Sequence, residues 1–160
     1  MADLSLRAMT TAEFDEWWLS IARAYAAEQV GIGNWSPDEA FESAVRDNTA
    51  LLPDGLATQG MLLLKAVGDD GNSVGVLWIG LTHPRGMPDC AFLYDIEVEE
   101  AYRGAGHGRA LLAAAEDVVR EHGVNNLELN VFSANTRAFR LYETAGYQAV
   151  AYRMRKSLLP

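Results

Sequence analysis

The most informative part of the chain is residues 94–109, which read YDIEVEEAYRGAGHGR. Its first part, up to Val98, belongs to an apolar run that starts at Cys90 and is typical of a strand. Its second part has glycines at positions 104, 106 and 108, directly before a segment with an apolar period of 3.6 residues. Glycines let backbone amides converge, and a helix start adds unpaired amides and a positive dipole end. The stretch therefore predicts a strand, a phosphate-binding turn and a helix.

Two well-known phosphate motifs do not fit this turn. A Walker A loop needs a lysine and then serine or threonine directly after its last glycine, whereas Arg109 follows Gly108. A dinucleotide fingerprint needs G-x-G-x-x-G and an acidic residue at the end of the next strand, whereas the spacing here is G-x-G-x-G and Glu121 belongs to the helix itself. The pattern that remains is R-x-x-G-x-G, formed by Arg103, Gly106 and Gly108.

The N-terminal part of the chain is expected to hold a strand and two helices. A short strand near Leu4 to Ala8 comes first. Thr10-Thr11-Ala12-Glu13 matches a capping box, which predicts a helix that runs to about Val30. Ser36-Pro37-Asp38-Glu39 predicts a second helix start, because proline at the first helical position loses no hydrogen bond and the acidic pair favours the positive end of the helix dipole.

The remaining segments alternate between strands and helices. Gly68-Asp69-Asp70-Gly71-Asn72 separates two apolar runs, a pattern typical of an antiparallel hairpin. The long helix that opens at Gly106 is expected to end at Gly123. Strands are expected at Met61–Val67, Ser73–Leu81, Cys90–Val98, Leu127–Phe132 and Tyr147–Lys156, and a short helix at Asn135–Ala145, ended by Gly146.

A second pattern lies near the C-terminal end. Asn135, Ala138, Leu141-Tyr142-Glu143 and Gly146-Tyr147 fit N-x-x-A-x-x-L-Y-E-x-x-G-[FY]. Asn135 and Tyr142 are about two helical turns apart, so they share one helix face with Ala138 between them. With R-x-x-G-x-G, this pattern resembles the two signatures of the GNAT superfamily of acyl-CoA-dependent N-acyltransferases, strongly over about residues 90–156.

The resemblance implies a fold, and it implies which parts of the chain bind the acceptor and the donor. The fold is a single α/β (α+β) domain over residues 1–160, with a central, mostly antiparallel mixed sheet, a splayed parallel strand pair and flanking helices. Acceptor-side helices would occupy about residues 10–50, and the acetyl-CoA-binding core about residues 90–156. The positions that would bind the donor are Ile96, Val98, Arg103, Gly104, Ala105, Gly106, His107, Gly108, Arg109, Asn135, Ala138 and Tyr142.

The resemblance also implies transfer of an acetyl group from acetyl-CoA to a primary amine, by direct attack in a ternary complex. A protonated amine cannot attack a thioester, so a base is needed. Asp95 and Glu97 are two apart on a strand and share one face, and either could take the proton. Tyr142 would protonate the departing thiolate. A non-catalytic acyl-CoA-binding or sensing domain and a transferase for a longer acyl donor stay open as alternatives.

The charge is distributed unevenly along the chain. The net charge of −9 argues against nucleic acid or an anionic membrane as a partner. Residues 1–100 hold 17 acidic and 5 basic side chains, a balance of −12, whereas residues 101–160 have a balance of +3. If one ligand is anionic, it is expected on the C-terminal part, and a cationic acceptor, a small molecule or a peptide, is expected over the N-terminal part. The alternative is that the acidic helices only keep the protein in solution. By resemblance, Tyr25, Glu28 and Trp35 would bind the acceptor.

The other candidate chemistry is weak. One cysteine and three histidines give no metal-ligand spacing, so no metal is expected. Cys90 is expected to be an inert small side chain, and the G-x-S-x-G match around Ser73 lacks the strand-to-helix context of a hydrolase. The chain has no apolar run long enough to span a membrane and no pattern typical of a leader, so a cytoplasmic location is expected. A homodimer is left open.

Overall fold

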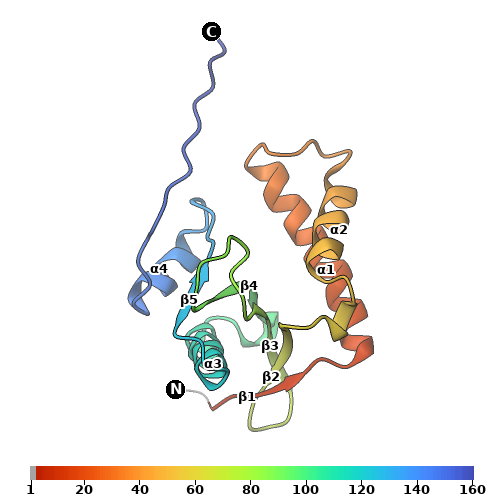
Figure 1. The fold of residues 1–160 in the computed structure, drawn as a ribbon, viewed down its shortest axis with the longest axis vertical. Helices are drawn as coiled ribbons and strands as arrows, with labels where there is room; N and C mark the ends of the chain where they lie inside the picture. The colour runs from red at the N-terminus through yellow and green to blue at the C-terminus, as the bar shows by residue number, and fades with distance from the viewer. Residues whose placement is uncertain (1–2) are drawn as a thin grey trace. The chain divides into compact units, whose positions relative to one another are not determined.

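Five strands form one sheet in the order β1-β2-β3-β4-β5 (Figure 1). The computed structural model describes residues 3–160. Neighbouring strands are antiparallel from β1 to β4, and β4 and β5 are parallel. The α/β fold class and the mixed, mostly antiparallel sheet are therefore confirmed. The strands are β1 Ser5–Ala8, β2 Met61–Val67, β3 Ser73–Gly80, β4 Cys90–Val98 and β5 Asn126–Leu129.

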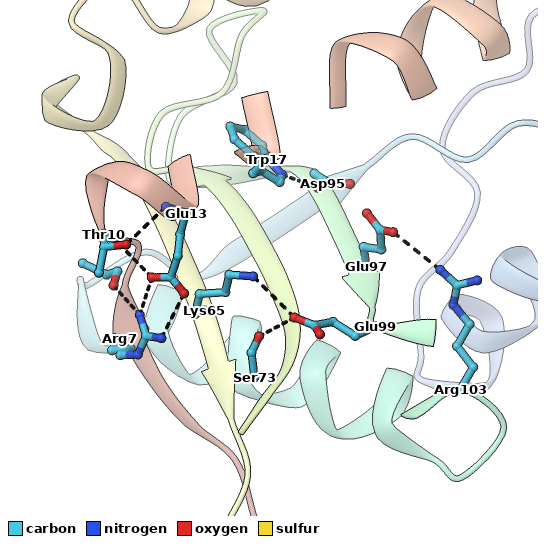
Figure 2. Close-up of polar contacts among 11 residues, drawn as sticks. Arg7, Thr10, Glu13, Trp17, Lys65, Ser73, Asp95, Glu97, Glu99 and Arg103 are labelled. Carbon is cyan, nitrogen blue, oxygen red and sulfur yellow. Dashed lines mark hydrogen bonds and ion pairs between the residues drawn. The ribbon is translucent and has the colours of Figure 1, made fainter. Parts of the chain in front are cut away.

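The first helix, α1 Thr11–Gly31, begins at the predicted capping box. The Glu13 amide donates to the Thr10 hydroxyl at 3.2 Å, and the Thr10 amide donates to the Glu13 carboxylate at 2.9 Å. Arg7 on β1 binds the same carboxylate through both Nη atoms, at 2.7 and 3.0 Å (Figure 2). The Arg7 contact, followed by the hydrogen bonds from Thr10, lowers the pKa of Glu13 to about 2. The junction between β1 and α1 is thus fixed by charge-assisted hydrogen bonds.

The second helix, α2 Ala40–Leu51, begins later than predicted. Residues 37–39 form a turn, in which the Glu39 amide donates to the Ser36 carbonyl at 3.3 Å. The helical bonding begins with the Ser43 amide, which donates to the Glu39 carbonyl at 3.0 Å, so Glu39 and not Ser36 is the N-cap. The helix start predicted at Ser36 was wrong, because a proline followed by two acidic residues is also compatible with a tight turn whose hydrogen bonds join residues three apart.

Helices cover both faces of the sheet. Trp17 of α1 packs in one apolar cluster with Val76 and Trp78 of β3. Gly75, which points to the opposite side of β3, faces Leu111 of α3 His107–Glu121. The side that α1 covers is called the α1 face below.

Two short 3₁₀ helices lie in connecting segments. η1 Gly55–Ala57 precedes β2, and η2 Glu100–Tyr102 follows β4. The hairpin predicted for β2 and β3 is confirmed, and Gly71 in its turn has a left-handed φ of 80°. None of the helices in residues 3–160 has the length and apolar character of a membrane-crossing segment.

Polar side chains hold the beginnings of the parallel strands together. The Asp89 carboxylate accepts hydrogen bonds from the backbone and side-chain amides of Asn125, at 3.0 and 2.9 Å. Glu128 on β5 contacts the buried His83 and accepts from Arg85 at 2.8 Å. The loop between β3 and β4 is therefore tied to the start of the β5 region.

The ladder between β4 and β5 is shorter than β4. It pairs Cys90–Leu93 with Asn126–Leu129 and stops there, although β4 continues to Val98. Residues 94–98 of β4 thus have no partner on β5. This is the arrangement that a splayed parallel pair requires.

The described chain divides into two compact units, one that ends at Leu129 and a second, Asn130–Pro160. The second contains α4 Thr136–Thr144, which confirms the predicted short helix, and Gly146 follows it with a φ of 100°.

Two of the strand predictions near the C-terminal end need correction. β5 ends at Leu129 and not at Phe132, and the strand predicted over Tyr147–Lys156 is wrong, since residues 147–160 hold neither helix nor strand. An apolar and β-prone run predicts an extended chain, but a strand also needs a hydrogen-bonded neighbour, which local sequence does not specify.

Candidate active site

A β-bulge in β4 shapes the α1 face of the sheet. Asp95 pairs with Trp78 and Leu93 pairs with Ile79, so Tyr94 is an extra residue without a partner on β3. Tyr94 stacks on Trp78, with ring centroids 4.7 Å apart. A bulge bends its strand and re-aims the side chains beside it, and bulges are common next to active sites. Here the bulge places Tyr94 and Asp95 side by side on the α1 face.

The two predicted carboxylates lie on this same face. Asp95 is opposite Trp78, and Glu97 is opposite Val76, and both of those β3 residues belong to the cluster beneath α1. Figure 2 shows both carboxylates on β4, on the strand that leads into the glycine-rich turn. The alternation predicted from sequence therefore holds after the bulge.

The carboxylate of Asp95 is partly buried against α1. The Nε1–H group of Trp17 donates a hydrogen bond of 3.1 Å to Asp95 Oδ2 (Figure 2). Burial raises the pKa of Asp95 to about 7, the Trp17 hydrogen bond opposes this rise, and the negative charges of Glu97 and Glu28 add to it. A carboxyl group that titrates near neutral pH can take a proton from a substrate and release it again.

Glu97 has a different environment. Its side chain is exposed, and one of its oxygens lies 3.5 Å from Nη2 of Arg103 (Figure 2). Arg103 also donates through Nε to the Val98 carbonyl at 3.0 Å. Glu97 is therefore an exposed carboxylate that lies beside a cation.

Glu99 continues the row of carboxylates and was not predicted as a site residue. It accepts a hydrogen bond from Ser73, and its Oε1 atom lies 3.4 Å from the Lys65 ammonium group (Figure 2). Of the three carboxylates, Glu97 and Glu99 thus contact cations, whereas Asp95 contacts a neutral indole. This difference separates Asp95 from its neighbours as a candidate base.

The glycine-rich turn leads from η2 into α3. Gly104 and Gly106 have left-handed φ values of 81° and 82°, and Gly106 is the N-cap of α3. Gly108 lies inside the first turn of α3 without a positive φ. A Cβ atom on Gly104 or Gly106 would meet none of the described atoms within 4 Å. The space beside these two glycines is therefore open, next to the unpaired amides at the start of α3.

The predicted donor-binding residues of the first unit follow one another along β4 and this turn. Ile96 and Val98 pair with Leu77 and Gly75 and lie on the α3 side of β4. The others occupy the turn and the first turn of α3: Arg103, Gly104, Ala105, Gly106, His107, Gly108 and Arg109.

Asn135, Ala138 and Tyr142 belong to the second unit. The Ala138 amide donates to the Asn135 side-chain oxygen at 3.2 Å, so Asn135 is the N-cap of α4. Tyr142 is partly buried, and its ring centroid is 6.0 Å from that of Tyr147. The three residues follow the spacing of one helix face, as the sequence predicts.

The predicted acceptor residues gather around the end of α1. The rings of Tyr25 and Trp35 meet edge-on with centroids 5.3 Å apart. The Tyr25 hydroxyl donates to Asp47 on α2 at 3.4 Å. Burial, with smaller contributions from Asp47 and Glu28, raises the pKa of Tyr25. The negative charge of Glu28 also contributes to the raised pKa of Asp95, so Tyr25 and Asp95 are influenced by the same carboxylate.

Two residues of this region, Trp17 and Asp47, were missed by sequence reasoning. Trp17 follows Phe14 by three residues and precedes Ile21 by four, a spacing that is typical of a core position on a helix. A buried indole N–H group nevertheless needs a hydrogen-bond acceptor, and this requirement could have indicated that Trp17 contacts a polar side chain. Asp47 gave no signal, because an acidic residue on a helix surface is ordinary.

The remaining candidates are structural. Cys90 is buried at the start of β4, and burial raises the pKa of its thiol. Ser73 opens β3 and donates to Glu99, which is no position for a hydrolase nucleophile. In residues 3–160, no three histidine, cysteine, aspartate or glutamate side chains converge into a group that could hold a metal ion.

Comparisons with known proteins all find similarity to acetyltransferases. The model of the acetyltransferase (GNAT) family matches residues 16–147. The uncharacterized N-acetyltransferase YycN of Bacillus subtilis (strain 168) is 36% identical over 155 residues, which cover 97% of this chain and 99% of that protein. A crystal structure of YycN superposes with a TM-score of 0.92 at 35% identity, over 99% of this chain and 100% of that one. The mycothiol acetyltransferase of Sanguibacter keddieii is 33% identical over 90% of this chain but only 43% of its own length.

Proposed function

Because the chain belongs to the acetyltransferase (GNAT) family and is an N-acetyltransferase, we propose that it moves an acetyl group from acetyl-CoA to a cationic primary amine by direct attack in a ternary complex. The observation that carries this proposal is the environment of Asp95. Its pKa of about 7 and its place on the strand that leads into the glycine-rich turn suit a base beside a bound thioester.

Asp95 begins the reaction in this proposal. An alkylammonium group, with a pKa near 10.4 in a lysine side chain, is mostly protonated at neutral pH. Asp95 takes the proton directly or through water, and the free amine then attacks the thioester carbonyl. Backbone amides near Val98 polarise that carbonyl. Tyr142 gives its phenolic proton to the sulfur as the carbon–sulfur bond breaks. The nitrogen, positively charged after its attack, loses a second proton, which restores the Tyr142 hydroxyl directly or through water. The products are an amide and a neutral thiol, and Asp95 keeps the first proton until it passes to solvent.

The glycine-rich turn supplies the donor site in this proposal. Gly104 and Gly106 keep the backbone in a conformation that other residues rarely adopt, and α3 begins directly after them. The amides at the start of α3 would then face the pyrophosphate of the donor, with the positive end of the helix dipole behind them. The open space beside both glycines fits a bulky anion.

Gly106→Val is expected to raise the Kd for acetyl-CoA by about tenfold or more, because a β-branched residue at positive φ strains the turn and blocks the phosphate. Isothermal titration measures the Kd, and the rise in Tm with acetyl-CoA provides a second readout. Gly123→Val is the matched control, since Gly123 has a similar φ of 77° at the other end of α3. Equal losses in both variants, or a Tm rise with NAD or ATP as large as with acetyl-CoA, would place the donor elsewhere.

The reaction itself is tested by thiol release from acetyl-CoA with a panel of amines. The panel contains polyamines, amino acids, aminoglycosides and peptides with free N-termini. At least one primary amine is expected to accelerate thiol release and to gain an acetyl group by mass spectrometry. Binding of acetyl-CoA without release for any amine would instead support a sensing domain. Faster release from a longer acyl-CoA would reassign the donor.

A cationic acceptor is expected to have a KM about tenfold lower than a neutral amine at low salt, because acidic groups attract it into the site. The aromatic rings of Tyr25 and Trp35 offer cation–π contacts, and Glu28 adds a negative charge. Added salt shortens the Debye length from about 8 Å at physiological salt and removes the advantage.

Two isosteric variants separate this attraction from the general charge of the protein. Glu28→Gln is expected to remove part of the cation preference. Asp117→Asn makes the same charge change on α3, where Asp117 pairs with Arg120 at 2.5 Å, and is expected to leave the preference intact. A preference that neither salt nor Glu28→Gln alters would show that the acidic helices only keep the protein in solution.

A further inference from the structure

Trp17 lies in an apolar cluster, but its one polar atom is directed at a carboxylate. The residue is only 6% exposed. Its ring meets Trp78 edge-on, with 5.5 Å between centroids, and Phe14 lies on another side at 5.8 Å. These contacts fix the orientation of the indole, which places Nε1 at 3.1 Å from Asp95 Oδ2 (Figure 2).

This contact makes the two oxygens of Asp95 unequal. An indole N–H can donate a hydrogen bond but cannot accept one. Oδ2 of Asp95 is therefore an acceptor whether or not the carboxyl group is protonated, and a hydrogen on Oδ2 would face the hydrogen of Trp17. A proton that Asp95 takes up consequently goes to Oδ1.

We propose that Trp17 is a positioning residue for acetyl transfer, which holds Asp95 so that Oδ1 is the atom that receives the substrate proton. This inference rests on the proposed function, in which Asp95 is the base. In the step, an N–H bond of the ammonium group breaks and an O–H bond forms at Oδ1. A neutral amine and a neutral carboxylic acid result, and the amine nitrogen keeps the electron pair with which it attacks.

Trp17 also acts on the charge of Asp95. Its hydrogen bond stabilises the carboxylate, whereas burial and the negative charges of Glu97 on β4 and Glu28 on α1 destabilise it. Tyr94, on the same face, has a pKa raised by burial and stays a neutral phenol at physiological pH. Without the indole, Asp95 would therefore hold its proton to a higher pH.

Trp17→Phe tests this proposal, because phenylalanine keeps an aromatic ring and removes the donor. The pH midpoint at which kcat/KM rises is expected to move up by about one unit, the order that one hydrogen bond to a charged group contributes. Trp78→Phe is the matched control: Trp78 is buried in the same cluster, but its Nε1 contacts Met61 Sδ at 3.5 Å. Its pH midpoint is expected to match that of the wild type, because phenylalanine keeps an aromatic ring beside Trp17 and removes an N–H group that does not contact Asp95.

A second readout does not depend on catalysis. In the wild-type protein, the indole N–H signal of Trp17 in a nitrogen-15 NMR spectrum is expected to shift from about pH 5 to about pH 9, as a partner carboxyl with a pKa near 7 titrates. In Asp95→Asn, this shift is expected to disappear. If no amine is acetylated but the NMR titration appears, the proposed function fails and the Trp17–Asp95 link stands. A Trp17 signal without titration, or equal pH midpoints in Trp17→Phe and Trp78→Phe, would overturn the inference.

Discussion

Asp95→Asn is expected to lower kcat by about a thousandfold, because general-base catalysis contributes on the order of a hundred- to ten-thousandfold and an amide takes no proton. The substitution keeps the shape of the side chain, and the amide oxygen still accepts from the Trp17 indole. The loss should therefore appear in turnover, with little change in the Kd for acetyl-CoA. Thiol release and isothermal titration measure the two quantities.

Glu97→Gln is the matched comparison, since the sequence leaves both carboxylates open as the base. Glu97 is exposed and lies 3.5 Å from Arg103. Its loss is expected to lower kcat by less than about tenfold, because an exposed ion pair contributes little. If Glu97→Gln were the more damaging substitution, the proton would go to Glu97.

Asp95→Asn is also expected to raise Tm above neutral pH. The pKa of Asp95 is about 7 in the folded protein, against an ordinary value of about 3.9 in an unfolded chain. Between these values the folded protein binds the proton more tightly, so the free energy of unfolding falls as pH rises from about 4 to about 7. Asparagine does not titrate, so the variant does not lose this part of its free energy of unfolding as pH rises. The Tm gap between variant and wild type should be small near pH 4 and largest above pH 7, and the opposite trend would contradict the raised pKa.

Tyr142→Phe is expected to lower kcat by about a hundredfold or more with little change in the Kd for acetyl-CoA, because it removes a general acid and keeps the ring. The alkaline limb of the kcat profile, which reports the acid, should also disappear. Steady-state kinetics across a pH series measures both effects.

Tyr147→Phe is the control for that experiment. Its ring packs against the ring of Tyr142, with centroids 6.0 Å apart, so it makes the same change within the same contact. The family pattern takes either phenylalanine or tyrosine at this position, and turnover should stay close to that of the wild type. Wild-type turnover in Tyr142→Phe would refute the acid role.

Patterns that are complete within a few residues predicted structure well. The capping box at Thr10 and Glu13 starts α1, and the glycine at 106 caps α3. Both depend on hydrogen bonds or dihedral angles of adjacent residues, which the local sequence dictates. The start of α2 and the strand expected over Tyr147–Lys156 were mispredicted, because a turn competes with a helix start and a strand depends on a distant neighbour.

Local sequence patterns were enough to predict the family, the order of the elements through α4 and two carboxylates on one strand face. Only the tertiary structure distinguished these carboxylates. The bulge at Tyr94 sets Asp95 beside Trp17, a residue 78 positions away, while Glu97 stays in solvent beside Arg103. A pKa is set by desolvation, hydrogen bonds and neighbouring charges, and those groups gather only when α1 packs on the sheet. For that reason our proposal of Asp95 as the base rests on the fold, and not on the spacing of the acids along the chain.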